Sequence, residues 1–74
     1  MNIVETISFM LKPEAIYRNK ENNGIIVVTN GKDEISENQV NELYDKIEEE
    51  ISLMILTSEE LVHIDKNIIG DRLL

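Results

Sequence analysis

The chain has 74 residues, no cysteine and a formal net charge of −8. We expect one domain spanning residues 1–74, with a marginal core, because a chain of this size buries only about 60% of its unfolded surface. The absence of cysteine removes disulfides and thiolate metal sites as sources of stability, and the negative charge argues against direct binding to nucleic acid or to an anionic membrane. Self-association is the remaining way to cover more apolar surface.

Residues 2–11 fit two interpretations. As a strand, the segment is rich in β-forming residues, and Ile3, Ile7, Phe9 and Leu11 share one face. As a helix, it would end near Pro13, because the residue before proline disfavours helical dihedral angles. The side chains on one side of that helix are Ile3, Val4, Ile7, Met10 and Leu11. We predict a short helix.

A β-hairpin is predicted over residues 14–29. Asn23-Gly24 lies between two β-prone runs, and both residues readily adopt the positive φ angles of a tight turn. The run IIVVT at 25–29 is apolar on both faces, so we expect it in the centre of a sheet. A hairpin alone is marginal and must pack on a helix. A second turn at residues 30–33 leads into the next element.

A long amphipathic helix is predicted over about residues 37–55. Ser36 and Gln39 form a capping box, which marks its start. The apolar side chains that follow at spacings of three and four are Val40, Leu43, Tyr44, Ile47, Ile51, Met54 and Ile55. The acids on the opposite side are Glu42, Asp45 and Glu49, with Glu48 and Glu50 on the flanks.

The end of this predicted helix, residues 53–56, is apolar on all sides and must be covered by the following segment or by a second copy. A second capping box, Thr57 to Glu60, starts another helix that runs towards Gly70. The predicted fold is α+β in the order α-β-β-α-α, with the hairpin packed on the long helix. The residues predicted to self-associate in a homodimer are Leu53, Met54, Leu56, Leu73 and Leu74.

No motif for catalysis or metal binding is present. His63 is the only histidine and has no second ligand at metal spacing, and no serine has a visible base. The acidic runs lack the calcium-loop pattern, and the Asn-Gly turns lack the phosphate-loop pattern. We therefore expect a protein that is not an enzyme and has neither cofactor nor metal. No apolar run reaches the roughly eighteen residues of a membrane span, and no signal peptide is visible, so a cytoplasmic location is expected.

The charge is concentrated in one segment, residues 33–60. This segment holds ten of the fifteen acids and one base, Lys46, for a net charge of −9, while the rest of the chain carries +1. The acids can be a solvated face that keeps a small protein soluble, or a surface for a cationic partner. As the candidate partner-binding residues we take Asp33, Glu34, Glu37, Glu42, Asp45, Glu48, Glu49, Glu50, Glu59 and Glu60.

In size, acidity and concentration of charge, the chain resembles the small acidic host-takeover proteins of bacteriophages. Some of these occupy the DNA site of nucleoid proteins such as the histone-like HU. The resemblance implies an inhibitor that imitates DNA, acts in the host cytoplasm and binds a basic DNA-binding protein. It covers no sequence motif, so it assigns no residue a role.

Two other functions fit the sequence. One is a small homodimeric adaptor or antitoxin-like module that grips a partner through the apolar end of the long helix, with acids that only solubilise it. The other is a nucleic-acid binder that uses the hairpin as a wing, which the net charge disfavours.

Overall fold

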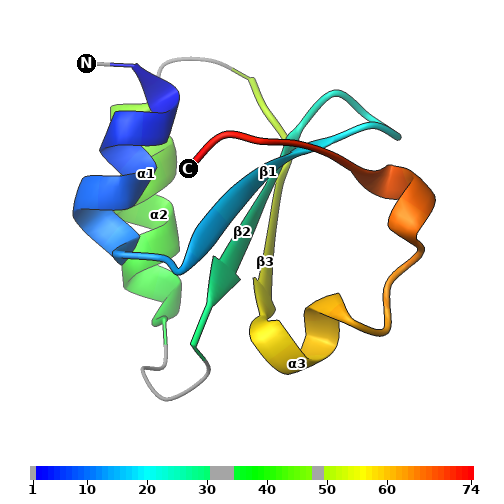
Figure 1. Ribbon diagram of the computed structural model, residues 1–74. Coiled ribbons are helices and arrows are strands. Elements are labelled where there is room, and N and C mark those ends of the chain that lie inside the picture. The colour runs from blue at the N-terminus through cyan, green and yellow to red at the C-terminus, as the bar shows by residue number, and fades with distance from the viewer. Residues whose placement is uncertain (1, 31–34, 48–49) are drawn as a thin grey trace.

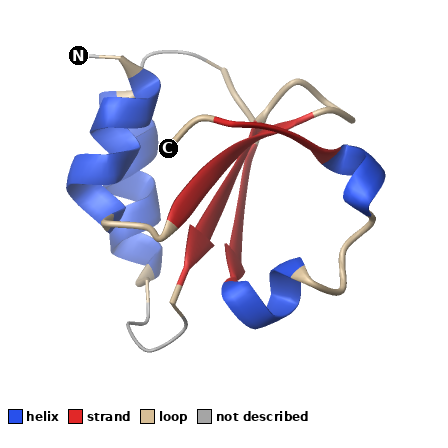
Figure 2. Cartoon of the chain, in the orientation of Figure 1, coloured by secondary structure: helices blue, strands red, loops and turns tan. Residues whose placement is uncertain are grey.

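A computed structural model describes residues 2–30, 35–47 and 50–74 (Figure 1). It contains a four-stranded mixed sheet in the order β3-β2-β1-β4. Helices α1 and α2 cover one face of this sheet, and the segment containing α3 lies on the other (Figure 2). The elements are α1 (Ile3–Leu11), β1 (Ala15–Asn19), β2 (Ile25–Thr29), α2 (Glu37–Lys46), β3 (Leu53–Thr57), α3 (Ser58–Leu61), the 3-10 helix η1 (Lys66–Ile68) and β4 (Ile69–Arg72). The predicted α+β class is confirmed.

The N-terminal segment is the predicted helix. Its first turn is capped by the Asn2 side chain, which accepts a hydrogen bond of 2.9 Å from the Glu5 backbone N–H. The helix stops at Lys12, whose φ of 47° is left-handed. Helical periodicity decides burial, since Ile7 is fully buried while Phe9 is 76% exposed. The strand alternative, which put these two residues on one face, is therefore wrong.

The predicted hairpin is confirmed, with β1 and β2 antiparallel and Ile16 opposite Val27. Of the two turn residues, Asn23 has the expected positive φ, at 60°. Gly24 serves a different purpose from the one predicted, because it lies against the backbone carbonyl of Ser52 and has no room for a Cβ atom. The predicted second turn falls largely on residues 31–34, outside the described residues.

Strand β2 is buried along its whole length, as its sequence predicts. Ile25 and Val27 point towards α1 and α2, where they join a cluster with Ile7 and Leu43. The alternate side chains of β2 point to the opposite face, under α3. The core therefore consists of two apolar layers that share this one strand.

The predicted long helix is wrong beyond Lys46. Ile47 is the C-cap residue of α2, with a ψ of 102°. Residues 53–57 form β3, which pairs parallel to β2 with Leu53 opposite Ile25. The reason is tertiary: β2 needs hydrogen-bonding partners on both edges and apolar cover on both faces. A run that is apolar at every position can supply both as a strand.

The predicted C-terminal helix is also mostly wrong. The second capping box is present, but α3 ends at Leu61 and the chain continues through η1 into β4. Gly70, predicted to follow a helix end, lies in β4 against β1, where an added Cβ would come within 2.9 Å of the Arg18 carbonyl oxygen. Within the described residues, the order α-β-β-α-α is thus replaced by α1-β1-β2-α2-β3-α3-η1-β4.

The close approach of Gly24 to Ser52 predicts that Gly24→Ala is destabilising. The added methyl group must push the hairpin turn away from the start of β3, at a cost of about 1–3 kcal/mol in the free energy of unfolding. Urea denaturation measures this cost. Glu21→Ala, an exposed change in the same turn, is the control and should change stability by less than about 0.5 kcal/mol. Equal stability of the two variants would contradict the role given to Gly24.

Candidate functional site

The exposed face of α2 carries three of the predicted acids, Glu37, Glu42 and Asp45. The opposite side of the helix is anchored by Leu43, which is fully buried beneath the sheet face that α1 and α2 cover. At about 1.5 Å of rise per residue, the three carboxylates span roughly 12 Å along the helix axis. We call these three residues the α2 acidic face.

The charges of the α2 acidic face are not neutralised within the described part of the chain. None of its three carboxylates forms an ion pair with another described residue. Glu37 lies in the first helical turn and Lys46 in the last, where the helix dipole favours a negative and a positive charge respectively. Glu42 lies between these turns and gains little from the dipole, and Asp45 lies in the last turn, where the dipole disfavours a negative charge. Their charges therefore lack a visible role in folding.

The structure does not gather all ten predicted acids on one surface. Because α2 ends at Lys46, it does not include Glu49, and the predicted row of Glu42, Asp45 and Glu49 is not formed by one helix. Glu50 is exposed in the segment that leads to β3. The predicted acids that lie outside the described residues are Asp33, Glu34, Glu48 and Glu49.

Glu59 and Glu60 belong to a different part of the molecule. They lie in α3, on the side of the sheet opposite α2 (Figure 1). Glu60 has a local structural role, because its carboxylate accepts a hydrogen bond of 3.1 Å from the Thr57 backbone N–H. Sequence proximity suggested one acidic segment, but the strand β3 carries the chain from one face of the sheet to the other.

The structure also places the residues predicted to self-associate differently from the sequence prediction. The apolar helix end does not exist, because Leu53, Met54 and Leu56 are half-buried residues of β3 that alternate between the two apolar layers. Leu73 packs against the layer formed with α1 and α2, while Leu74 is 46% exposed. Self-association through an apolar helix end is therefore excluded.

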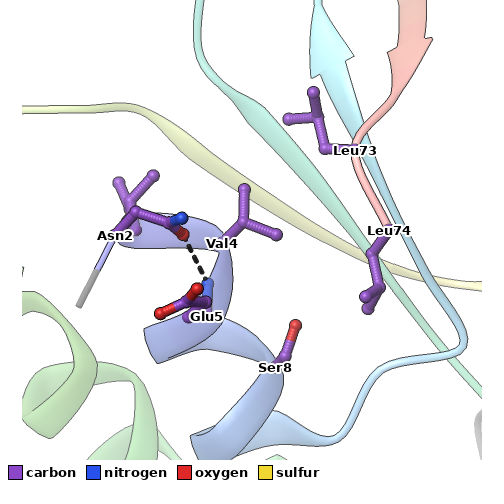
Figure 3. Close-up of a pocket in the computed structure, with 7 residues that line it drawn as sticks. Asn2, Val4, Glu5, Ser8, Leu73 and Leu74 are labelled. Carbon is purple, nitrogen blue, oxygen red and sulfur yellow. Dashed lines mark hydrogen bonds between the residues drawn. The ribbon is translucent and has the colours of Figure 1, made fainter.

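A shallow groove lies between α1 and the C-terminal tail (Figure 3). Its volume is about 640 Å³, and its lining residues are Asn2, Ile3, Val4, Glu5, Ser8, Leu73 and Leu74. The Ser8 hydroxyl is buried and has no hydrogen-bond partner among the described residues. Sequence reasoning missed this group, because burial of one serine on an amphipathic helix leaves no local signal. His63 is exposed in the turn after α3 and does not line the groove.

Within residues 2–30, 35–47 and 50–74, no three His, Cys, Asp or Glu side chains gather in a way that could hold a metal ion. No helix in this part of the chain is long and apolar enough to cross a membrane.

Comparisons with protein-family models, with characterised proteins and with solved structures find no match to this chain.

The start of α2 is fixed by the capping box, in which Ser36 accepts a hydrogen bond of 3.2 Å from the Gln39 N–H and donates its own N–H to the Gln39 side chain. Ser36→Ala should therefore lower the free energy of unfolding by about 0.5–2 kcal/mol, measured by urea denaturation. Ser58→Ala, at an exposed position beside the other capping box, should have a smaller effect. If Ser36→Ala were as stable as the parent chain, the capping box would not be what fixes the start of α2.

Proposed function

We propose that this chain is a non-enzymatic, protein-binding inhibitor that presents the α2 acidic face to a basic DNA-binding protein, such as a histone-like nucleoid protein. Binding there would block access of DNA to the partner. The observation that carries the proposal is that Glu42 and Asp45 are exposed on a helix anchored from its other side, with no ion pair among the described residues.

The row of carboxylates along one helix supports an imitation of DNA. Each strand of B-form DNA places one phosphate per about 3.4 Å of helix axis. The three carboxylates of the α2 acidic face span about 12 Å of helix, so neighbouring charges are on average roughly 6 Å apart along the axis. A groove that binds one DNA strand would therefore meet a row of negative charges on α2 with roughly half the linear density of the phosphates.

The position of the charges on a helix also supports binding. The buried Leu43 and Ile47 hold α2 against the sheet, so its carboxylates are presented from a rigid element and not from a loop. A preorganised acidic surface steers a basic partner towards it and raises the association rate. A net charge of −8 over the whole chain adds to this long-range attraction.

The proposal predicts that neutralising the α2 acidic face abolishes capture of the partner. The test variant is Glu37→Gln, Glu42→Gln and Asp45→Asn together. Tagged protein is used to recover partners from nuclease-treated bacterial lysate, and the recovered protein is identified and titrated. The parent chain should recover a basic DNA-binding protein that competes with DNA and is released by salt, because the Debye length falls from about 10 Å at 0.1 M to about 3 Å at 1 M.

The matched control carries the same change in net charge elsewhere, through Glu14→Gln, Glu21→Gln and Asp71→Asn, all exposed positions outside α2. It should keep most of the affinity, while the α2 variant should lose at least about tenfold. Unchanged affinity of a folded α2 variant, or a partner that resists high salt, would show that the acids serve only solubility.

A further inference from the structure

Strand β3 forms one edge of the sheet, and its outer side is open in the described structure. Ile25 donates a hydrogen bond of 2.9 Å to the Ser52 carbonyl, which sets the parallel ladder with β2. In a parallel strand, the backbone groups of every second residue bond to the same neighbouring strand. The backbone groups of Ser52, Met54 and Leu56 therefore point towards β2. The N–H and C=O groups of Leu53 and Ile55 therefore point away from the sheet, towards solvent.

This edge lacks the features by which proteins normally protect an exposed strand. Its five residues include no charge and no proline, and its register with β2 is continuous from Leu53 to Thr57. The opposite edge, β4, is short, bears the exposed charges of Asp71 and Arg72, and has an irregular register with β1. The two edges of the sheet therefore differ, and only β3 is suited to accept another strand.

We propose that β3 pairs antiparallel with β3 of a second copy of this chain, about a two-fold axis at Met54. In this register Leu53 faces Ile55 of the second copy, and Ile55 faces Leu53 of the second copy. Each of these pairs exchanges two backbone hydrogen bonds, so all four open groups of Leu53 and Ile55 in both copies are satisfied. Thr57, the next residue that points outwards, already has its N–H bonded to Glu60.

A second copy fits this edge better than an arbitrary strand for two reasons. The open residues lie symmetrically on either side of Met54, so the edge is complementary to itself. Pairing also closes the assembly, because the resulting eight-stranded sheet has the protected β4 at both outer edges. Side chains of β3 that are half-buried in one copy become covered by the other, which adds apolar burial to a small core.

The pairing places both copies of α2 on the same face of the continuous sheet, because opposed residues of antiparallel strands point to the same side. Two α2 acidic faces would then lie on one side of the dimer. The use of both acidic faces to bind one partner rests on the proposed function. The pairing itself does not, and it is tested without any partner.

The experiment uses the absence of cysteine from the chain, so that each variant has one thiol. In the proposed register Met54 faces Met54 of the second copy, with Cα atoms about 4.5 Å apart, within the range of a disulfide. Met54→Cys should therefore oxidise to a covalent dimer of twice 8.5 kDa. Ser52→Cys and Leu56→Cys are the matched controls, because each lies about 13 Å along the strand from its own counterpart and should not cross-link alone.

When the two control variants are mixed, they should cross-link to each other, because Ser52 faces Leu56 of the second copy in this register. Sedimentation of the parent chain should give twice the monomer mass, and the dimer fraction should rise with salt, since screening weakens repulsion between two copies of charge −8. A monomer at all salt concentrations, or equal cross-linking of all three single variants, would overturn the proposal. Partner capture through the α2 acidic face weakens with salt, so the two proposals fail in distinguishable ways.

Discussion

The fold depends on one constraint, the need to bury β2 on both faces and to pair it on both edges. Each Ile or Val side chain of this strand contributes roughly 1.5–3 kcal/mol when it is removed from water. Four such side chains, Ile25 to Val28, point alternately into two apolar layers, and all of them are buried. A strand in this position leaves no backbone group exposed, and the chain on either side of it must supply the cover.

The surrounding elements follow from that requirement. On one edge β1 pairs through a tight hairpin, and on the other β3 pairs in parallel after the crossover through α2. Parallel pairing requires a crossover, usually helical, that returns the chain to the same end of the sheet. Helix α2 can therefore be only as long as the crossover allows, and it ends at Lys46 with its apolar side against the sheet. Its acidic side is left exposed by the same geometry.

The same arrangement separates two groups of acidic residues that lie close together in the sequence. The α2 acidic face lies over one face of the sheet, and Glu59 and Glu60 lie over the other. Between them, β3 presents an uncharged edge. An ionic surface and a backbone hydrogen-bonding edge respond differently to salt, so these two surfaces are chemically distinct.

Local signals in the sequence were sufficient for part of the fold. Pro13 and the stripe through Ile7 determine the first helix, Asn23 permits the hairpin turn, and the two capping boxes mark two helix starts. These features depend on residues within a few positions of one another, where backbone sterics and local hydrogen bonds dominate. The buried, central position of residues 25–29 was also visible, because polar residues are absent from both faces.

The rest was decided by tertiary contacts. Residues 53–57 are apolar at every position, a pattern that fits either a buried helix or a buried strand, and the open edge of β2 selected the strand. Gly70 reads as a helix end, yet the close passage of β4 over Arg18 requires it in a strand. For the candidate site, sequence alone determined the amount of acidic charge and its segment. Only the sheet decided which carboxylates share a face, because neighbours in the chain can lie on opposite sides of a strand.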